Sequence, residues 1–349
     1  MTTNPFGVRY PIILSPMAGP GTPELAAAVS NAGGLGSLPA AYGSPAQISA
    51  AIARTRELTD KPFAVNLFIH GAAPLDRDPK PALAKLAEMH SELGIAPPTL
   101  PPWPIESLDA QLEAVLAANV AVFSFTFGIP TPAWIDRFRA AGTMLVGTAT
   151  TVAEAVALGD AGVDAIVAQG AEAGAHRGTF IGTFEDALVP LATLVPEVVR
   201  TMSPLPVIAA GGIRHGSEIA AVLRAGAAAA QIGTAFIPCP ESAAAESYKQ
   251  AVLASGGVRP GQTVVTRAVS GRAARGIPNR LIREMESLGD DLLPYPWQNA
   301  ATRAIRTAGA KADQPEFLSL WAGEGMSAIR QLPAAELVAA LVREAAINS

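Results

Sequence analysis

Short apolar runs alternate along this chain with longer segments in which apolar residues recur at helical spacing. The runs predict buried strands, and the segments after most of them predict amphipathic helices. The predicted strands are 12–17, 35–40, 63–68, 121–126, 144–149, 165–169, 207–210 and 229–234. The predicted helices are 23–32, 45–58, 108–118, 132–140, 152–161, 217–225 and 242–253. Eight such strands predict an α/β fold, a parallel sheet closed into a (β/α)8 TIM barrel.

Glycines support this order of elements. An Ala-Gly pair precedes several predicted strands, with the glycine at Gly33, Gly142, Gly162 and Gly226. Glycine just past a helix takes the left-handed conformation that turns the chain back toward the sheet. An open doubly wound sheet is the competing fold, but residues 16–21 after the first strand match its glycine-rich turn poorly.

Two regions fall outside the strand–helix alternation. One is a proline-rich insertion with a helical patch at 81–92, and the other is the C-terminal tail. We assign 1–70, 106–240 and about 262–298 to the barrel, and 71–105, 241–261 and 299–349 to a helical cap or substrate domain. Insertions after barrel strands lie on the face that carries active sites, so the cap is expected to cover the site.

Composition narrows the class of protein. Half of the 349 residues are hydrophobic, the net charge is −5, and Lys and Arg form no long run, so nucleic acid is not an expected partner. The single cysteine, Cys239, cannot form an internal disulfide, and no Cys/His pair has zinc spacing, so no metal is expected. No signal peptide and no membrane-length apolar run are visible. We therefore expect a cytoplasmic protein without a membrane partner.

Glycine-rich turns follow the seventh and eighth predicted strands. They contain Gly211-Gly212 and Gly233-Thr234. Loops at these two positions of a TIM barrel often bind phosphate through backbone N–H groups, where a Cβ would block the approach. A single such turn would be read as an ordinary tight turn. Two turns at both positions favour a phosphate site.

Polar residues near the strand ends suggest the rest of a site. Asn66 and Gln169 are amides that either cap backbone groups inside the barrel or face a heteroaromatic ring, and the sequence leaves both readings open. His176 follows a strand in a loop of small residues, which favours catalysis. Among the other candidates, Glu172 is expected to anchor the loop and His90 to be solvated. A solvated turn is likewise expected for Arg267, Arg272 and Arg275.

Several segments together resemble the nitronate monooxygenase family, from residue 11 to about residue 285. They are Pro16-Met17-Ala18, Asn31-Ala32-Gly33-Gly34-Leu35-Gly36, Asn66-Leu67-Phe68, Ser124-Phe125-Thr126-Phe127-Gly128-Ile129-Pro130, the His176 loop and the two glycine turns. The resemblance implies an FMN-binding barrel with a helical cap and His176 as the catalytic residue. The implied FMN contacts are Pro16, Met17, Ala18, Asn66, Gln169, Gly174, Gly211, Gly212, Gln231, Ile232, Gly233 and Thr234. The implied pocket residues are Thr126, Phe127, Ser270 and Tyr295.

The chain departs from the family pattern at two positions. Ala175 replaces the second glycine of the usual Glu-Ala-Gly-Gly-His segment, and Thr126 stands where members often carry histidine. A glycine that uses a positive φ would not be replaced by alanine without strain. The loss of a second imidazole bears on the substrate and not on flavin binding.

The expected function is FMN-dependent oxidation of alkyl nitronates by O2 to a carbonyl compound and nitrite. The expected partners are therefore a small-molecule substrate and O2. His176 would act either as a neutral base or as an imidazolium that pairs with the nitronate. The alternatives are an enoyl-thioester (enoyl-acyl-carrier-protein) reductase or another NAD(P)H-dependent flavin reductase, and a non-catalytic flavin-binding protein. The apolar segment 337–342 is either a contact of a homodimer or packs on the barrel.

Overall fold

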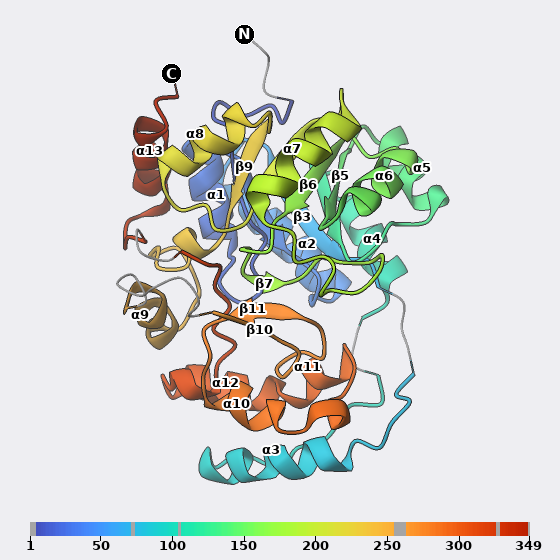
Figure 1. Ribbon diagram of the computed structural model, residues 1–349, viewed down its shortest axis with the longest axis vertical. Helices are drawn as coiled ribbons and strands as arrows, with labels where there is room; N and C mark the ends of the chain where they lie inside the picture. The colour runs from blue at the N-terminus through green and yellow to red at the C-terminus, as the bar shows by residue number, and fades with distance from the viewer. Residues whose placement is uncertain (1–4, 71–73, 104–105, 255–262, 326–328, 348–349) are drawn as a thin grey trace.

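Eight parallel strands form the centre of the molecule (Figure 1). The computed structural model describes residues 5–70, 74–103, 106–254, 263–325 and 329–347. The strands are β1 (Ile12–Leu14), β2 (Gly36–Pro39), β3 (Phe63–Phe68), β4 (Val122–Thr126), β5 (Met144–Ala149), β6 (Ala165–Gln169), β8 (Val207–Ala210) and β9 (Ala229–Ile232). Their order is β1-β9-β8-β6-β5-β4-β3-β2. The Leu14 amide donates to the Leu35 carbonyl over 2.9 Å, which joins β1 to the chain entering β2 and closes the barrel. The predicted TIM barrel is confirmed.

Helices cover the outside of the barrel. They are α1 (Pro23–Asn31), α2 (Pro45–Leu58), α4 (Leu108–Ala117), α5 (Pro132–Ala140), α6 (Val152–Asp160), α7 (Leu191–Met202) and α8 (Gly216–Arg224). The side chains of Thr22, Ser44 and Thr151 accept the amide three residues on, so each helix begins at its N-cap. Helix α7 was not predicted, although Leu191, Leu194, Val195 and Val198 give it an apolar face.

The strands alternate between two environments. In β3, Val65 and Leu67 belong to the hydrophobic cluster shared with the helices, whereas Ala64 belongs to a cluster inside the barrel. Successive side chains of a strand point to opposite faces, so Asn66 also points inward. At the carboxyl ends of the strands the inward positions are polar or small. They are Asn66, Ser124, Thr126, Thr148, Gln169, Ala210 and Gln231, all of which line a cavity.

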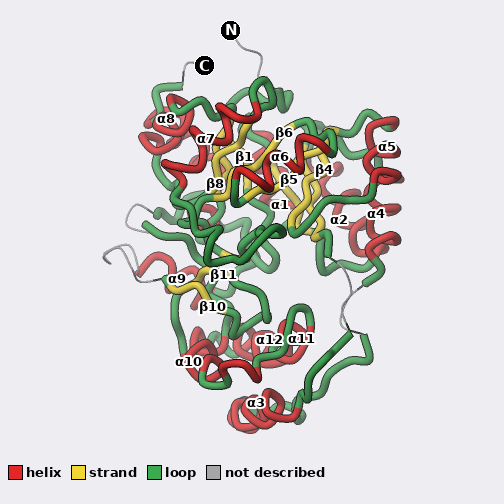
Figure 2. The backbone as a smooth tube through the Cα atoms, turned by 45° about the vertical axis from the view of Figure 1, so that its right-hand side comes forward, coloured by secondary structure: helices red, strands yellow, loops and turns green. Residues whose placement is uncertain are grey.

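A second body of helices faces this end of the barrel (Figure 1 and Figure 2). It consists of α3 (Lys80–Glu92), α10 (Arg280–Glu286), α11 (Trp297–Ala301) and α12 (Arg303–Lys311). Leu86, Met89, Leu281 and Trp297 share its own hydrophobic cluster. A three-stranded antiparallel sheet of β10 (Val264–Thr266), β11 (Ala274–Gly276) and β7 (Ala175–His176) lies between cap and barrel.

The packing differs from the predicted domain boundaries at two points. Several residues predicted as barrel, including Val269, Leu281, Met285 and Leu293, pack in the cap cluster. The eight barrel strands pair with each other and leave no edge for β10 and β11. The last helix, α13 (Ala334–Glu344), was predicted as cap but packs against α1 and α8. Its Leu337, Val338 and Leu341 are buried there, so the apolar segment 337–342 packs on the barrel. The boundaries predicted at 71, 105, 261, 262 and 349 lie outside the described residues.

Helix α9 (Glu246–Ala254) packs through Tyr248 and Val252 against Leu318 and Leu320 of the segment that leads back from the cap. In the described part of the chain, none of the helices combines the length and apolar character that a membrane crossing requires.

Candidate active site

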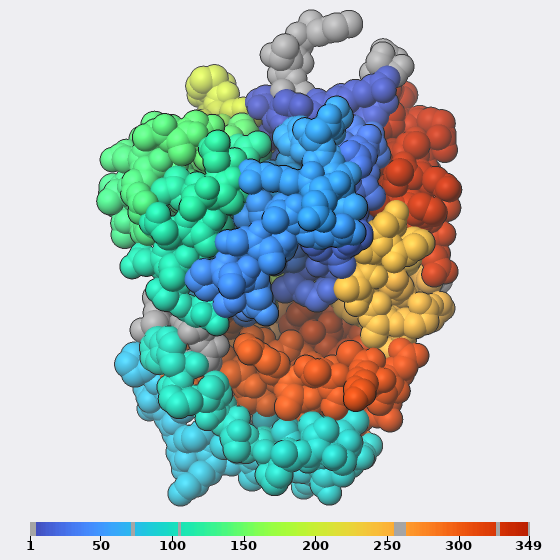
Figure 3. Space-filling model, turned by 180° about the vertical axis from the view of Figure 1, so that it is seen from behind, coloured from blue at the N-terminus to red at the C-terminus, as the bar shows by residue number. Residues whose placement is uncertain are grey.

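A cavity of about 500 Å³ lies at the carboxyl ends of the barrel strands, beneath the cap. This volume is within the range of about 300–1,000 Å³ of small-molecule sites. Seen from behind, a recess separates the barrel segments from the cap segments (Figure 3). The predicted residues that line the cavity are Pro16, Met17, Ala18, Asn66, Thr126, Gln169, Gly174, His176, Gly211, Gly212, Gln231, Gly233 and Thr234.

Four other predicted residues lie behind the cavity wall. The side chain of Ile232 is buried in the main core. Phe127, Ser270 and Tyr295 contact the imidazole of His176 instead. Ser270 and Tyr295 belong to the cap side, and no sequence spacing could have placed them against a barrel loop.

The backbone of His176 is fixed on two sides. His176 pairs with Ala274 in the ladder of β7 and β11, and the Gln169 side-chain amide donates to the His176 carbonyl over 3.0 Å. The Gly178 amide donates to the side-chain oxygen of Gln169 over 2.8 Å. The structure therefore gives Gln169 the capping role that the sequence left open, while its side chain also borders the cavity.

Aromatic rings surround the imidazole. The ring centroids of Phe68, Phe127, Tyr295 and Trp321 lie 5.9, 5.7, 6.0 and 5.8 Å from that of His176. The His176 Nε2 lies 2.8 Å from the Ser270 hydroxyl. A ring held this way has a defined orientation toward the cavity.

The electrostatics favour the neutral imidazole. Burial in this aromatic shell, together with the positive charges of Arg272 and Arg306, lowers the pKa of His176 from 6.5 to about 3. The imidazole is then uncharged near pH 7 and has a nitrogen lone pair available, but the same low pKa makes it a weaker base than an ordinary histidine. The sequence also allowed the hypothesis that His176 acts as a charged imidazolium. This environment does not support that hypothesis.

The loop before His176 needs two unusual backbone features. Ala175 has φ +61°, a left-handed conformation that glycine adopts more easily, yet β7 still pairs with β11. Ala175 therefore carries local backbone strain, while the loop still forms its ladder with β11. Gly174 lies so close to the segment around Gly323 that a Cβ would be 2.5 Å from the Gly323 amide nitrogen.

The glycine turns approach their surroundings closely. Gly211 and Gly212 have φ +133° and +67°, and a Cβ on Gly211 would lie 3.0 Å from the Ala173 nitrogen. A Cβ on Gly233 would lie 3.2 Å from the Cβ of Ser15. The positive φ angles of Gly211 and Gly212 favour glycine there, and a side chain on Gly233 would force its neighbours to shift.

A segment that the sequence analysis missed forms part of the wall. Residues 319–325 return from the cap across the glycine turns, and Ser319, Trp321, Gly323, Glu324 and Gly325 line the cavity. We call residues 319–325 the strap. The Gly323 amide donates to the Thr234 hydroxyl over 3.0 Å, and the Glu324 amide donates to the Glu172 carbonyl over 2.9 Å. A Gly-x-Gly pattern at Gly323 and Gly325 was the available signal.

Two arginines predicted in a solvated turn lie against the site instead, Arg275 buried and Arg272 partly buried. Arg272 stacks on Phe127, with its guanidinium carbon 3.7 Å from the ring centroid. Arg275 pairs with Glu324 over 2.8 Å and donates to the Ala171 carbonyl. The prediction was wrong because antiparallel pairing with β7 draws the turn beneath the cap. Arg303 and Arg306 of α12 also line the cavity.

Further predictions concern residues away from the cavity. His90 is 2% exposed and contacts the Ala96 carbonyl. The prediction that this side chain is solvated was therefore wrong. The Glu172 carboxylate accepts a hydrogen bond from the Leu191 amide, which confirms that Glu172 anchors the loop.

Burial raises the pKa of the Cys239 thiol to about 12. Within the described residues, no group of three or more His, Cys, Asp or Glu side chains is arranged to hold a metal.

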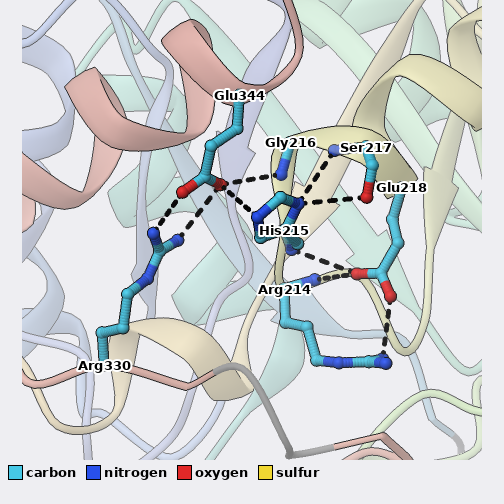
Figure 4. A network of polar contacts seen from close by, with 7 residues as sticks. All are labelled: Arg214, His215, Gly216, Ser217, Glu218, Arg330 and Glu344. Atoms are coloured by element: carbon cyan, nitrogen blue, oxygen red, sulfur yellow. Dashed lines mark hydrogen bonds and ion pairs between the residues drawn. The ribbon is translucent and has the colours of Figure 1, made fainter.

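Ion pairs tie the C-terminal helix to the barrel beside the cavity (Figure 4). The Glu344 carboxylate contacts Arg330, accepts the Gly216 amide over 3.1 Å and lies 3.3 Å from the His215 Nε2. We call Glu344, Arg330, His215 and Gly216 the C-terminal clasp. The neighbouring Arg214 lines the cavity and pairs with Glu218 over 3.0 Å.

Comparison with known proteins assigns the family. The sequence profile described as nitronate monooxygenase matches residues 1–344. A nitronate monooxygenase of Pseudomonas aeruginosa is 43% identical over 98% of both chains. A probable nitronate monooxygenase of Staphylococcus saprophyticus is 38% identical over 98% of this chain and 96% of its own.

Two solved structures are similar to this chain over nearly its whole length. A nitroalkane oxidase from Streptomyces ansochromogenes is 40% identical over 97% of this chain and 96% of its own, with a TM-score of 0.89. FabK from Thermotoga maritima is 28% identical over 97% of this chain and 93% of its own, with a TM-score of 0.75. With the profile spanning nearly all residues and the relatives covered almost end to end, this chain belongs to the nitronate monooxygenase family.

Proposed function

We propose that this chain oxidises alkyl nitronates with O2 to carbonyl compounds and nitrite, with FMN bound in the cavity. In balanced form, two nitronate anions and one O2 give two carbonyl molecules and two nitrite anions. The observation that carries the proposal is the neutral His176 on the wall of a cavity that also contains both glycine turns. Family membership supports the same chemistry.

The residues present fit a flavin mononucleotide. Gly211, Gly212 and Gly233 line the cavity, so no side chain stands between their backbone and a ligand bound there. We propose that these turns and the Thr234 hydroxyl hold the phosphate. The inward-facing Asn66 and Gln231 and the wall at Pro16–Ala18 would hold the ring system. The bound flavin would supply the electron-transfer chemistry that protein side chains lack.

The chain's own residues would bind and prepare the substrate. Phe68, Met17 and Trp321 give the cavity an apolar wall that suits small alkyl groups. Arg303 and Arg306 place positive charge at the cap end, which favours an anionic nitronate over its neutral form. His176 would remove the α-proton of a neutral nitroalkane and so generate the nitronate in place.

Anaerobic mixing tests the proposal. The purified, flavin-loaded protein should lose its oxidised-flavin absorbance when mixed with a nitronate, and should produce nitrite when O2 is admitted. Flavin that stays fully oxidised would contradict the proposal. Rapid bleaching by NADH or NADPH with turnover of an enoyl thioester would support the reductase alternative instead. Bound flavin that no donor reduces would indicate a non-catalytic flavin-binding protein.

Matched variants test the role of the histidine. His176→Ala should keep bound flavin and reduce turnover of a neutral nitroalkane by about 10²–10⁴-fold, the usual contribution of a general base. His215→Gln alters a histidine outside the cavity wall and should retain turnover. Equal activity of both variants would remove His176 from the mechanism.

A further inference from the structure

Ser270 forms the contact that decides which nitrogen of His176 carries the proton. It is 1% exposed and lies outside the cavity wall. Its hydroxyl oxygen is 2.8 Å from the His176 Nε2 and 3.0 Å from the Arg272 carbonyl oxygen. The Arg272 amide nitrogen also donates to this oxygen, over 3.3 Å.

The hydroxyl has one hydrogen, so two arrangements are available. If that hydrogen goes to the Arg272 carbonyl, the His176 Nε2 must donate to the hydroxyl oxygen, and all three contacts of Ser270 are hydrogen bonds. If the hydrogen goes to Nε2 instead, the Arg272 carbonyl loses its side-chain partner. The first arrangement satisfies more buried polar groups, which native proteins strongly favour.

We infer that Ser270 is a positioning residue that holds His176 as the Nε2–H tautomer and leaves Nδ1 as the nitrogen that accepts a proton in the cavity. Nε2 points at a buried hydroxyl while the ring borders the cavity, so Nδ1 is the nitrogen free to meet a ligand. The use of Nδ1 as a base rests on the proposed function. There the substrate Cα–H bond breaks, Nδ1 gains the proton, and the electron pair moves to the nitro group to give the nitronate.

The turn around Ser270 is rigid enough to impose this choice. Gly271 has φ +82°, and a Cβ there would lie 2.5 Å from both the Leu293 oxygen and the Tyr295 nitrogen. Arg272 is held by its stacking on Phe127. The backbone of this turn is therefore fixed by packing, and the hydroxyl is held by its hydrogen bonds with the Arg272 carbonyl and amide.

Nitrogen NMR of the resting protein tests the tautomer directly. The protein is loaded with FMN and labelled with ¹⁵N-histidine, and the signals of His176, one of four histidines, are assigned by their loss in His176→Asn. We expect Nε2 in the range of a protonated ring nitrogen and Nδ1 in that of an unprotonated one. The reverse pattern would overturn the inference. This readout needs no turnover, so its outcome is distinguishable from success or failure of the proposed catalysis.

Variants at Ser270 test the cause. Ser270→Ala should give a mixture of tautomers, and Ser270→Thr, which keeps the hydroxyl, should restore the single tautomer. In Ser270→Ala the ratio of kcat/KM for a neutral nitroalkane to that for its preformed nitronate should fall about tenfold or more, since only the neutral substrate needs the base. An unchanged tautomer or an unchanged ratio in folded Ser270→Ala would overturn the role of Ser270. If Ser270→Ala does not fold, the wild-type tautomer and Ser270→Thr decide.

Discussion

Gly174 and Gly323 bring two distant backbone segments into contact, and neither position has room for a side chain. A Cβ on Gly174 would lie 2.5 Å from the Gly323 nitrogen, and a Cβ on Gly323 would lie 2.7 Å from the Glu172 oxygen. One segment leads into the strand of His176, and the other is the strap that crosses the glycine turns. Their contact closes one wall of the cavity, so its shape depends on both glycines.

Gly174→Ala should therefore weaken both the fold and the cavity. Overpacking of this kind typically destabilises a protein by about 1–3 kcal/mol. Urea unfolding should show this loss, and FMN should bind more weakly because the strap is displaced. Gly43→Ala is the control, since its Cβ would meet nothing closer than 3.4 Å. Equal stability of the two variants would show that the contact is looser than described.

Ala175→Gly should stabilise the protein. Ala175 has φ +61°, and the left-handed conformation costs an L-residue roughly 1–2 kcal/mol. The greater freedom of glycine in the unfolded chain offsets part of this gain. We expect a net increase of about 0.5–1 kcal/mol in the free energy of unfolding. Ala173→Gly, at a buried alanine of the same loop, should destabilise, and a loss of stability in both variants would argue against strain at Ala175.

Turnover should not show the decline near pH 6.5 that protonation of an ordinary catalytic histidine causes. The pKa of His176 is lowered to about 3 by burial and by Arg272 and Arg306, so the imidazole stays neutral as the pH falls. For a neutral nitroalkane, kcat/KM should then be flat from about pH 8 to about pH 5 and decline only in stronger acid. A decline centred near 6.5, the ordinary value for histidine, would contradict the environment described for His176.

The C-terminal clasp should stabilise the fold in a pH-dependent way. Burial alone raises the pKa of Glu344, but hydrogen bonds from Arg330 and the Gly216 amide outweigh it and hold the pKa below 4.5. A lowered native pKa contributes stability above the unfolded value and loses it as the pH falls through the native value. Glu344→Gln should cost roughly 1 kcal/mol at pH 7, and the difference from wild type should shrink below about pH 4.5.

Glu336→Gln is the control for the clasp. Glu336 lies in the first turn of the same helix and is exposed. Its substitution should change the free energy of unfolding by no more than about 0.5 kcal/mol. The measurement is urea unfolding of wild type and both variants at pH 7 and near pH 4. A Glu344→Gln effect that persists unchanged at the lower pH would show that the carboxylate charge is not its source.

The barrel could be predicted from the sequence because each strand and helix carries its own signal. The runs at 63–68 and 144–149 coincide with β3 and β5, and inward polar residues such as Asn66 stand out within them. The cavity's other walls could not be predicted. The strap packs on Thr234, and Ser270 packs on His176, from segments that are 89 and 94 residues away in the sequence. Arg272 is likewise placed by packing between distant segments. Local periodicity does not encode contacts of this kind.

The central claim is that the cavity holds FMN with its phosphate on the two glycine turns. The direct measurement is titration of flavin-free protein with FMN and with riboflavin, which lacks the phosphate, followed by flavin fluorescence. We predict that FMN binds at least about 100-fold more tightly, a difference of about 2.8 kcal/mol. Equal affinities, or a folded protein that binds neither flavin, would contradict the claim.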